Sequence, residues 1–143
     1  MAIKGTARLL VEAGIAKPTP KLGQALGPLG VNMMEFCKSF NDKTSGLKPE
    51  CVMRVKLVAF DDRTFTYEVC PPATTWFLKR AAGITKGSPM PGHTMVGKVS
   101  VKALYEIAQL KKEHDPSFAA AELHSLTKTV AASARTLGLE ITR

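Results

Sequence analysis

The sequence predicts an α+β protein built from two small domains, and three observations support this prediction. Apolar and polar residues alternate between residues 52 and 69 around a short turn, as they do in two adjacent strands. Two prolines follow at Pro71 and Pro72, and no helix or central strand runs through such a pair. Beyond them, apolar residues recur at helical spacing. We therefore expect an N-terminal α/β domain over 1–70 with a three-stranded sheet and helices, a stiff Pro-Pro elbow over 71–73, and a three-helix domain over 74–143.

The first strand is expected over residues 3–11, IKGTARLLV, which begin with alternation and end in an apolar run. The next segment, 13–32, reads AGIAKPTPKLGQALGPLGVN and holds four glycines, three prolines and no acidic residue. It also holds several apolar residues, so it is neither a typical spacer loop nor a typical core element. We interpret it as a shaped surface whose apolar side chains pack on the α/β domain.

A helix is predicted after this segment, because apolar residues recur there at near-helical spacing. These residues are Val31, Met34, Phe36, Cys37 and Phe40. Asn32 is suited to cap the N-terminus of this helix. In the hairpin that follows, Asp61 and Asp62 fall in the turn, where short side-chain acceptors bond the local backbone.

The C-terminal half predicts three helices. The first, TTWFLKRAAG, begins at Thr74 and ends at Gly83. A polar loop, ITKGSPMPGHTMVGKV, leads to the second helix, which Ser100 caps and for which Val99 and Leu104 have the spacing of a hydrophobic staple. The third helix is expected over about 118–137 and ends at Gly138. The expected inner face of the second helix consists of Val101, Leu104, Ala108 and either Leu110 or Lys111.

The charge balance points to a polyanionic partner. The formal net charge is +8, and the isoelectric point is about 9.6. Nucleic acid is the first candidate and an acidic membrane surface the second, while a basic protein with no such partner is the plain alternative. No apolar run approaches the length of a membrane span. The N-terminal residues favour a strand over a signal peptide or the end of an organellar presequence.

Catalytic and metal chemistry have little support in this sequence. Cys37, Cys51 and Cys70 are far apart and have no metal-site spacing with the histidines, so we expect three buried, reduced thiols and no metal or cofactor. The glycines of GQALGPLG match neither the dinucleotide-binding pattern nor the P-loop. Adjacent aspartates in a turn point apart, which favours a turn role over a carboxylate pair. The sequence therefore predicts a protein that is not an enzyme.

The last predicted helix has an unusual outer face. Its inner stripe is apolar, and its opposite face has small or hydroxyl-bearing residues, two cations and no acid. That face consists of Ser125, Lys128, Thr129, Ala132, Arg135 and Thr136. Small side chains allow close approach of a backbone, and hydroxyls bond to ribose and phosphate. This combination suits the wide, shallow minor groove of RNA better than the major groove of DNA.

The loop TKGSPMPGH is the second candidate nucleic-acid contact. Gly87 and Gly92 leave backbone amides open to close contact, and Lys86 supplies charge, so the loop suits a phosphate. A plain surface loop is an equally good interpretation of these residues alone. The neighbouring basic helix favours the RNA interpretation.

The ordered motifs resemble those of the ribosomal protein L-eleven family, the universal large-subunit protein of the GTPase-associated region. The resemblance covers nearly the whole chain, in order: AGIAKPTPKLGQALGPLGVNMMEFCKSFNDKT, DRTFTY, PPA, LKRAAGITKGS, VGKVS, EIAQLK and SARTLGL. Each fragment alone is weak, but all of them in order are specific.

The resemblance implies a structural constituent of the ribosome with two domains. The C-terminal helical domain of this family binds large-subunit rRNA. The N-terminal domain moves on the Pro71–Pro72 hinge, helps receive translational GTPases such as elongation factor G beside the stalk ribosomal proteins, and forms the cleft for thiopeptide antibiotics. No membrane partner is implied. YEIAQLKKEHDP looks organellar, which favours a mitochondrial ribosome, with the bacterial cytoplasm and the plastid as alternatives.

Site residues follow from the resemblance by position. The rRNA contacts would be Lys86, Gly87, Ser88, Lys128, Ala132, Ser133, Arg135 and Thr136. The factor- and thiopeptide-facing residues would be Pro18, Pro20, Lys21, Gly23, Gln24, Leu26 and Gly27.

This chain departs from the family pattern at several of these positions. The family usually has Pro where this chain has Lys21 and Gln24, and the antibiotic cleft is sensitive at those positions. It usually has Gly where this chain has Ala132 and Ser where it has Thr136, so each position gains a methyl group. Lys38 aligns with a lysine that some bacterial members methylate, although an exposed helix lysine is the simpler interpretation. The alternative function is that of a protein-interaction module, which docks a partner through the Gly/Pro-rich segment without RNA.

Overall fold

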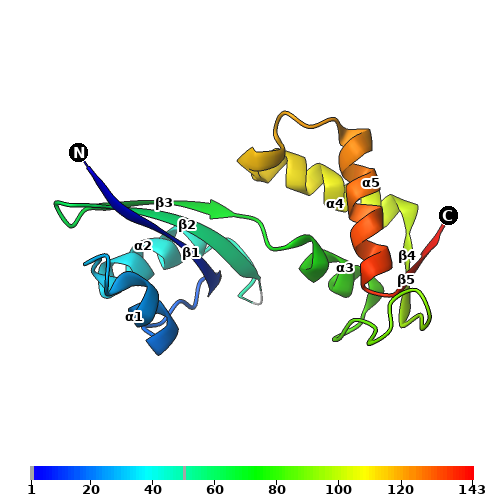
Figure 1. The fold of residues 1–143 in the computed structure, drawn as a ribbon, viewed down its shortest axis with the longest axis horizontal. Helices are drawn as coiled ribbons and strands as arrows, with labels where there is room; N and C mark the ends of the chain where they lie inside the picture. Colours follow the sequence, from blue (N-terminus) through cyan, green and yellow to red (C-terminus); the bar gives the residue numbers. More distant parts are fainter. Residues whose placement is uncertain (1, 50) are drawn as a thin grey trace. The chain divides into compact units, whose positions relative to one another are not determined.

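The computed structural model describes residues 2–49 and 51–143, which form two compact units that separate between Cys70 and Pro71 (Figure 1). The first unit combines a three-stranded antiparallel sheet with two helices, and the second is mainly helical. The predicted α+β class, with its three-stranded sheet, is confirmed. All peptide bonds between described residues are trans, including those of Pro71 and Pro72.

The sheet of the first unit has the order β1-β2-β3. Its strands are β1 (Ile3–Glu12), β2 (Val52–Phe60) and β3 (Phe65–Cys70). Two helices, α1 (Pro20–Leu26) and α2 (Met33–Thr44), lie on one side of this sheet (Figure 1). Alternate residues of β1 and β2, such as Leu9 and Val55, are therefore buried against the helices. The alternation seen in the sequence reflects this one-sided burial.

Helix α1 lies inside the Gly/Pro-rich segment, for which the sequence analysis predicts no helix or strand. Thr19 caps it by accepting a hydrogen bond from the Leu22 N–H at 3.4 Å, and Pro20 occupies the first turn, where its missing N–H costs nothing. Leu22 and Leu26 are buried in the core. The segment thus contains a capped helix of about two turns with one buried side.

Helix α2 begins where the sequence predicts. Asn32 accepts a hydrogen bond from the Met34 N–H at 3.2 Å, which confirms its role as N-cap. Phe36 and Phe40 are fully buried, with their ring centroids 5.9 Å apart. Met34 is 65% exposed, so its place in the predicted apolar stripe is wrong. At about 100° per residue, Met34 falls beside the stripe formed by Phe36, Cys37 and Phe40 rather than within it.

The three cysteines, all of them among the described residues, form no disulfide bond and are not equally buried. Cys37 and Cys70 are buried, whereas Cys51 is only half-buried, which corrects the expectation of three buried thiols. Burial also raises the pKa of the Cys37 thiol, so less reactive thiolate is present at a given pH.

A maleimide reagent should therefore distinguish two of these thiols in the native chain. We expect Cys51 to be modified much faster than Cys37, and we expect the difference to vanish in denaturant. Mass spectrometry of peptides taken during the reaction measures both rates. Equal rates in the native chain would contradict this burial pattern.

The second unit contains three longer helices and a small parallel sheet. Its elements are α3 (Thr74–Ala82), β4 (Gly97–Ser100), α4 (Val101–His114), the 3₁₀ turn η1 (Pro116–Phe118), α5 (Leu123–Thr136) and β5 (Leu139–Thr142). Strands β4 and β5 pair in parallel. The sequence predicted the three helices and missed this sheet, because each strand has only four residues and its partner is about forty residues away.

Local signals placed several helix ends correctly. Ser100 caps α4 by accepting from the Ala103 N–H at 3.2 Å, and Val99 and Leu104 are both buried in the same core. Gly83 ends α3 in the left-handed region, with φ of 70°. Helix α3 begins at Thr74, as predicted, and its N-cap is Ala73, which makes no side-chain hydrogen bond to the helix.

Other details of the prediction are wrong. Helix α5 begins at Leu123 rather than near residue 118, because the chain first forms η1, where Asp115 accepts from the Ser117 N–H. Val101 is exposed, and Lys111 rather than Leu110 is buried on the inner face of α4. The Lys111 ammonium lies 5.8 Å from the centre of the Phe118 ring, so its long side chain packs under η1.

Candidate nucleic-acid interface

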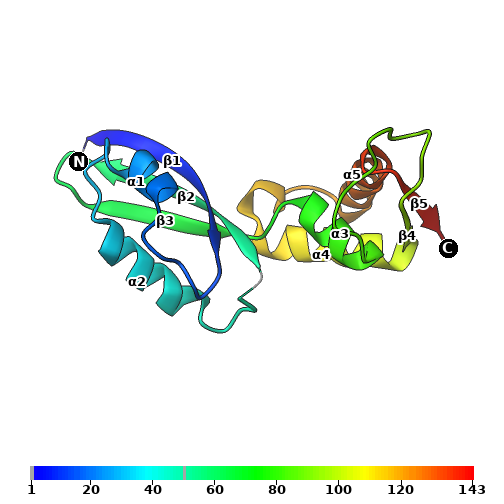
Figure 2. The ribbon, with the colours of Figure 1, turned by 90° about the horizontal axis from the view of Figure 1, so that it is seen from below.

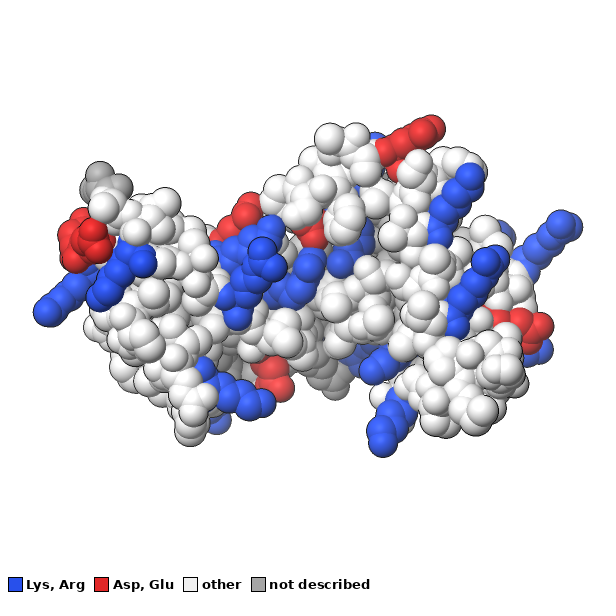
Figure 3. Space-filling view, in the orientation of Figure 1, with Lys and Arg blue, Asp and Glu red and all other residues white. Residues whose placement is uncertain are grey.

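The outer face of α5 is the first part of the candidate interface. Leu126, Val130 and Ala134 point into the core. The opposite face carries exposed side chains, namely Ser125, Lys128, Thr129, Ala132, Arg135 and Thr136. Helix α5 has no acidic residue, and Figure 3 shows basic side chains projecting over it, with acidic ones only near its two ends. This face therefore presents positive charge over small residues.

Four of the five hydroxyl groups of α5 are already engaged as donors. Each of four hydroxyls donates to a carbonyl of the preceding turn: Thr127 to Leu123 at 2.8 Å, Thr129 to Ser125 at 3.0 Å, Ser133 to Thr129 at 3.1 Å and Thr136 to Ser133 at 2.7 Å. Their oxygens keep free lone pairs, which accept hydrogen bonds. A ribose 2′-OH can donate to such an oxygen, whereas a phosphate cannot. The helix is thus better suited to ribose than the sequence alone indicates.

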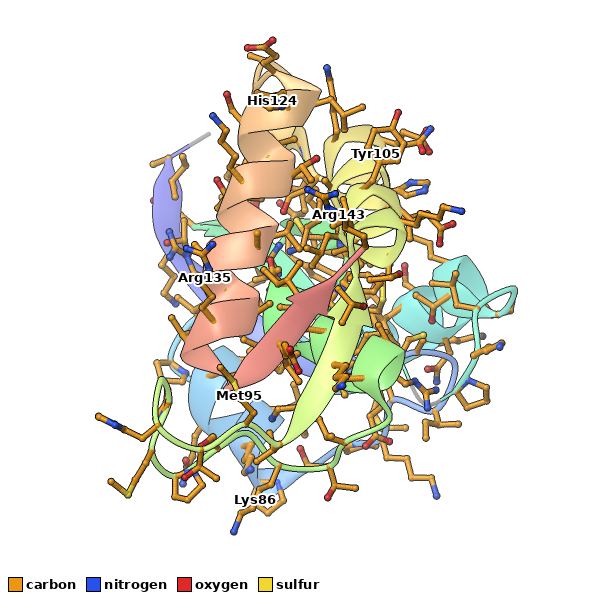
Figure 4. All side chains as sticks on the ribbon, turned by 90° about the vertical axis from the view of Figure 1, so that its right-hand side faces the viewer. Lys86, Met95, Tyr105, His124, Arg135 and Arg143 are labelled. Atoms are coloured by element: carbon orange, nitrogen blue, oxygen red, sulfur yellow. The ribbon has the colours of Figure 1, made fainter. Side chains whose placement is uncertain are left out.

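The loop over residues 84–96 is the second part, and it is fixed to the end of α5. The Ser88 N–H donates to the Leu137 carbonyl at 2.9 Å, and the Val96 N–H donates to the Gly138 carbonyl at 3.0 Å. The structure therefore brings the predicted loop residues Lys86, Gly87 and Ser88 beside the predicted end of the helix. Figure 4 shows this arrangement, with Arg135 on α5 and the loop residues Met95 and Lys86 below it.

Gly138 makes this docking possible. Its φ of 78° lies in the left-handed region, which favours glycine. A Cβ atom added there would overlap Ser88 Cβ and would lie 2.9 Å from the Thr94 carbonyl oxygen. Both contacts are too close for any side chain. The loop and the helix consequently meet at a position that only glycine fits.

The structure adds features that the sequence reasoning missed. Met90 and Met95 are each 57% exposed on the loop. The Met90 carbonyl accepts from the N–H groups of His93 and Thr94, so the loop tip is a defined turn. On α3, the Arg80 guanidinium lies 5.1 Å from the Trp76 ring centre. Trp and Arg spaced by four residues on a helix are the signal that could have found this pair.

The predicted rRNA-contact residues differ in exposure. Lys86, Lys128, Ala132, Arg135 and Thr136 are exposed, while Gly87, Ser88 and Ser133 are half-buried. Of the half-buried members, Gly87 and Ser88 lie where the loop contacts the end of α5. They shape the surface through their backbone, and the exposed members supply charge and contact area.

The factor-facing residues lie on and before α1. Pro18, Pro20, Lys21, Gln24 and Gly27 are exposed, and Gly23 is half-buried. Leu26 is only 1% exposed and belongs to the core, so its predicted role as a surface contact is wrong. Helical spacing explains this result, because Leu22 and Leu26 share the inner face of α1. Lys21 and Gln24 are on the accessible side of α1.

No described helix has both the length and the apolar character that a membrane span requires. Over 2–49 and 51–143, His, Cys, Asp and Glu side chains do not gather into a group of three that could hold a metal ion.

Comparison with known protein families covers both units. The family described as "Ribosomal protein L11, N-terminal domain" matches residues 7–65, and the family described as "Ribosomal protein L11, RNA binding domain" matches residues 70–141. The second match includes both α5 and the loop that docks on it. The chain therefore belongs to the ribosomal protein L11 family and is a structural, non-enzymatic, RNA-binding component of the large ribosomal subunit.

Proposed function

We propose that the chain binds large-subunit rRNA at the GTPase-associated region through α5 and the loop docked on it. The observation that carries this proposal is the Gly138 junction, which holds a glycine-rich loop beside an acid-free, small-residue helix face. Such a surface lets an RNA minor groove approach the helix backbone closely. Phosphates flanking that groove meet the cations of the face and of the loop.

The residues have three kinds of role in this proposal. Lys86, Lys128 and Arg135 neutralise phosphates. Ala132, Ser133 and Thr136 form the close contact, and the two hydroxyl oxygens accept from ribose. Gly87 and Ser88 set the loop backbone against the helix.

The N-terminal unit is proposed to help form the stalk base, where translational GTPases such as elongation factor G dock beside the stalk ribosomal proteins. The exposed residues of the α1 segment would face the factor: Pro18, Pro20, Lys21, Gly23, Gln24 and Gly27. Leu26 would support them from the core. We also propose that the two domains comprise residues 1–70 and 74–143 and that Pro71 and Pro72 form the hinge between them. The resemblance of the Gly/Pro-rich motif to that of the L11 family supports this factor-facing role. In this proposal, the affinity for thiopeptides depends on Lys21 and Gln24.

We also propose a mitochondrial ribosome as the location, with a bacterial cytoplasm or plastid as alternatives. Sucrose-gradient sedimentation of lysates from separated compartments tests this assignment. The chain should co-sediment with large ribosomal subunits of one compartment. Its absence from every large-subunit fraction would contradict the ribosomal proposal itself.

A substitution at Ala132 tests the close-contact role. Ala132→Gln keeps good helix propensity and adds no charge, so the fold should keep its stability. The longer side chain would hold RNA away from the helix, and we expect rRNA affinity to fall roughly tenfold. Filter binding or fluorescence anisotropy with a fragment of the GTPase-associated rRNA measures the change.

The matched control is Ala81→Gln, the same change at an exposed position of α3. It should leave the affinity within about twofold of the unsubstituted chain. Equal affinities for the two variants would mean that α5 does not approach RNA closely.

A further inference from the structure

We infer that the groove along the free edge of β1 binds an extended, acidic segment of a partner protein, which adds to the sheet as a fourth strand. This inference extends the proposed protein-facing role of the α1 segment to an adjacent surface. It requires no RNA contact, so it can be tested separately from the rRNA interface.

The lining of the groove shows that it follows the strand edge. Five consecutive β1 residues, Arg8 to Glu12, line it. Side chains of a strand alternate between the two faces of the sheet, so five neighbours share one groove only when it runs along the backbone edge. The opposite wall consists of Ile15, Ala16, Lys17, Thr19, Lys21, Leu22 and Ala25. The groove encloses about 750 Å³, which is within the range of ligand clefts. Figure 2 shows β1 along one edge of the sheet, with α1 next to it.

The hydrogen-bond register identifies the backbone groups that face the groove. Ala13 donates to the Cys51 carbonyl at 2.9 Å, directly after the last pair of the β1–β2 ladder, Glu12 with Val52. Antiparallel ladders alternate hydrogen-bonded and non-hydrogen-bonded pairs. The odd residues of β1 therefore bond to β2, while Arg8, Leu10 and Glu12 direct their N–H and C=O groups to the open edge. An added strand would form its backbone hydrogen bonds with these three residues.

This half of the edge lacks the usual protection against strand addition. Edge strands are normally guarded by proline, by bulges or by covering segments. In β1 the bulge lies between Ile3 and Gly5, and the Leu29 side chain lies over Gly5. The stretch from Arg8 to Glu12 is regular, and Leu10 in its middle is 71% exposed. A partner strand would cover this leucine.

Charge and chemistry identify the occupant. Arg8, Lys17 and Lys21 line the groove with Glu12 as the single acid, so an acidic segment is favoured. Apolar side chains fill the space between these charges, which favours a peptide of alternating acidic and apolar residues. None of the described lining residues is aromatic, and single-stranded RNA depends on aromatic stacking platforms. A second copy of the chain would bring like charges together across the edge.

The test uses the full chain and a capped peptide of alternating Glu and Val, about seven residues long, to span the five strand residues. Amide hydrogen exchange of the free chain should be fast at Arg8, Leu10 and Glu12. Saturating peptide should slow exchange at these three amides roughly tenfold, with much smaller changes at Leu9 and Val11. A peptide N-methylated at alternate residues cannot form the ladder and should not bind. A peptide with Lys in place of Glu should bind far more weakly.

Two substitutions of Leu10 distinguish the role of its backbone N–H from the role of its side chain. Leu10→Pro removes a donor that faces the edge and none that faces β2, so it should abolish protection. Leu10→Thr keeps that donor, so the peptide should still give most of the protection from exchange. Thermal unfolding of both variants verifies the fold, and the N-methylated peptide remains decisive if the proline variant does not fold.

Several results would overturn the inference. Equal binding of the N-methylated peptide would mean that no strand is added. Protection of the same amides by an oligouridylate would assign the groove to RNA. Slow exchange in the free chain, together with a dimer in light scattering, would assign it to a second copy. Measuring rRNA affinity on the same sample distinguishes each of these results from failure of the RNA interface.

Discussion

Gly138→Ala should destabilise the second unit more than the same change at an exposed glycine of this unit, because Gly138 is buried. A non-glycine residue in the left-handed region costs about 1–3 kcal/mol, and overpacking adds about 1–3 kcal/mol. Both terms apply at Gly138, where the new Cβ would overlap Ser88 and Thr94. We expect a loss of about 3 kcal/mol or more in the free energy of unfolding, measured by denaturant titration. Trp76 is the only tryptophan, so its fluorescence reports on this unit.

Gly83→Ala is the matched control for this experiment. Its φ of 70° is close to that of Gly138, but an added Cβ would meet no atom within 4 Å. Only the backbone term remains, so we expect a loss of about 1 kcal/mol. rRNA affinity should fall with Gly138→Ala and stay nearly unchanged with Gly83→Ala. Similar losses of stability would mean that the loop is not docked at Gly138.

Charge reversal on α5 should have the largest effect on RNA binding. Lys128 and Arg135 are exposed on the face of α5 opposite its buried residues, and the helix has no acidic residue. Replacing both by Glu removes two phosphate contacts and introduces repulsion, so we expect affinity to fall roughly a hundredfold. The slope of log affinity against log salt should also decrease by about two. Anisotropy titrations at three salt concentrations measure both quantities.

Lys102→Glu and Lys43→Glu are the controls for charge alone. Lys102 is an exposed cation on α4, and Lys43 lies over the Tyr67 ring of the first unit. Each should weaken binding by no more than about twofold, through the general field of the protein. If Arg135→Glu alone has no greater effect than these controls, the α5 face is not the RNA surface.

The fold was predictable where its signals are local. Asn32 and Ser100 mark helix starts, because a short side-chain acceptor bonds the next backbone N–H groups. The hairpin of β2 and β3 follows from alternation over a one-sided sheet. Helix α1 was missed because glycine and proline argue against helices, although Thr19 followed by Pro20 is a helix-start signal. Its stability comes from Leu22 and Leu26 packing in the core.

The candidate site was only partly predictable. The α5 face follows from helical periodicity, so its cations and small residues could be named in advance. The contact between the loop and α5 depends on a hydrogen bond from Ser88 to Leu137, which links residues far apart in the sequence. No spacing rule predicts such a contact. The burial of Leu26 and the intrahelical bonds of the α5 hydroxyls likewise needed the three-dimensional structure.

Cross-linking of the full chain to large-subunit rRNA tests the central claim most directly. Ultraviolet irradiation of the complex, followed by digestion and mass spectrometry, locates the residues that touch nucleotides. Within the second unit, we predict cross-links in the loop over 84–96 and on the outer face of α5, around Ala132 and Arg135. Cross-links confined to α4, with none in the loop or on α5, would contradict the proposed interface.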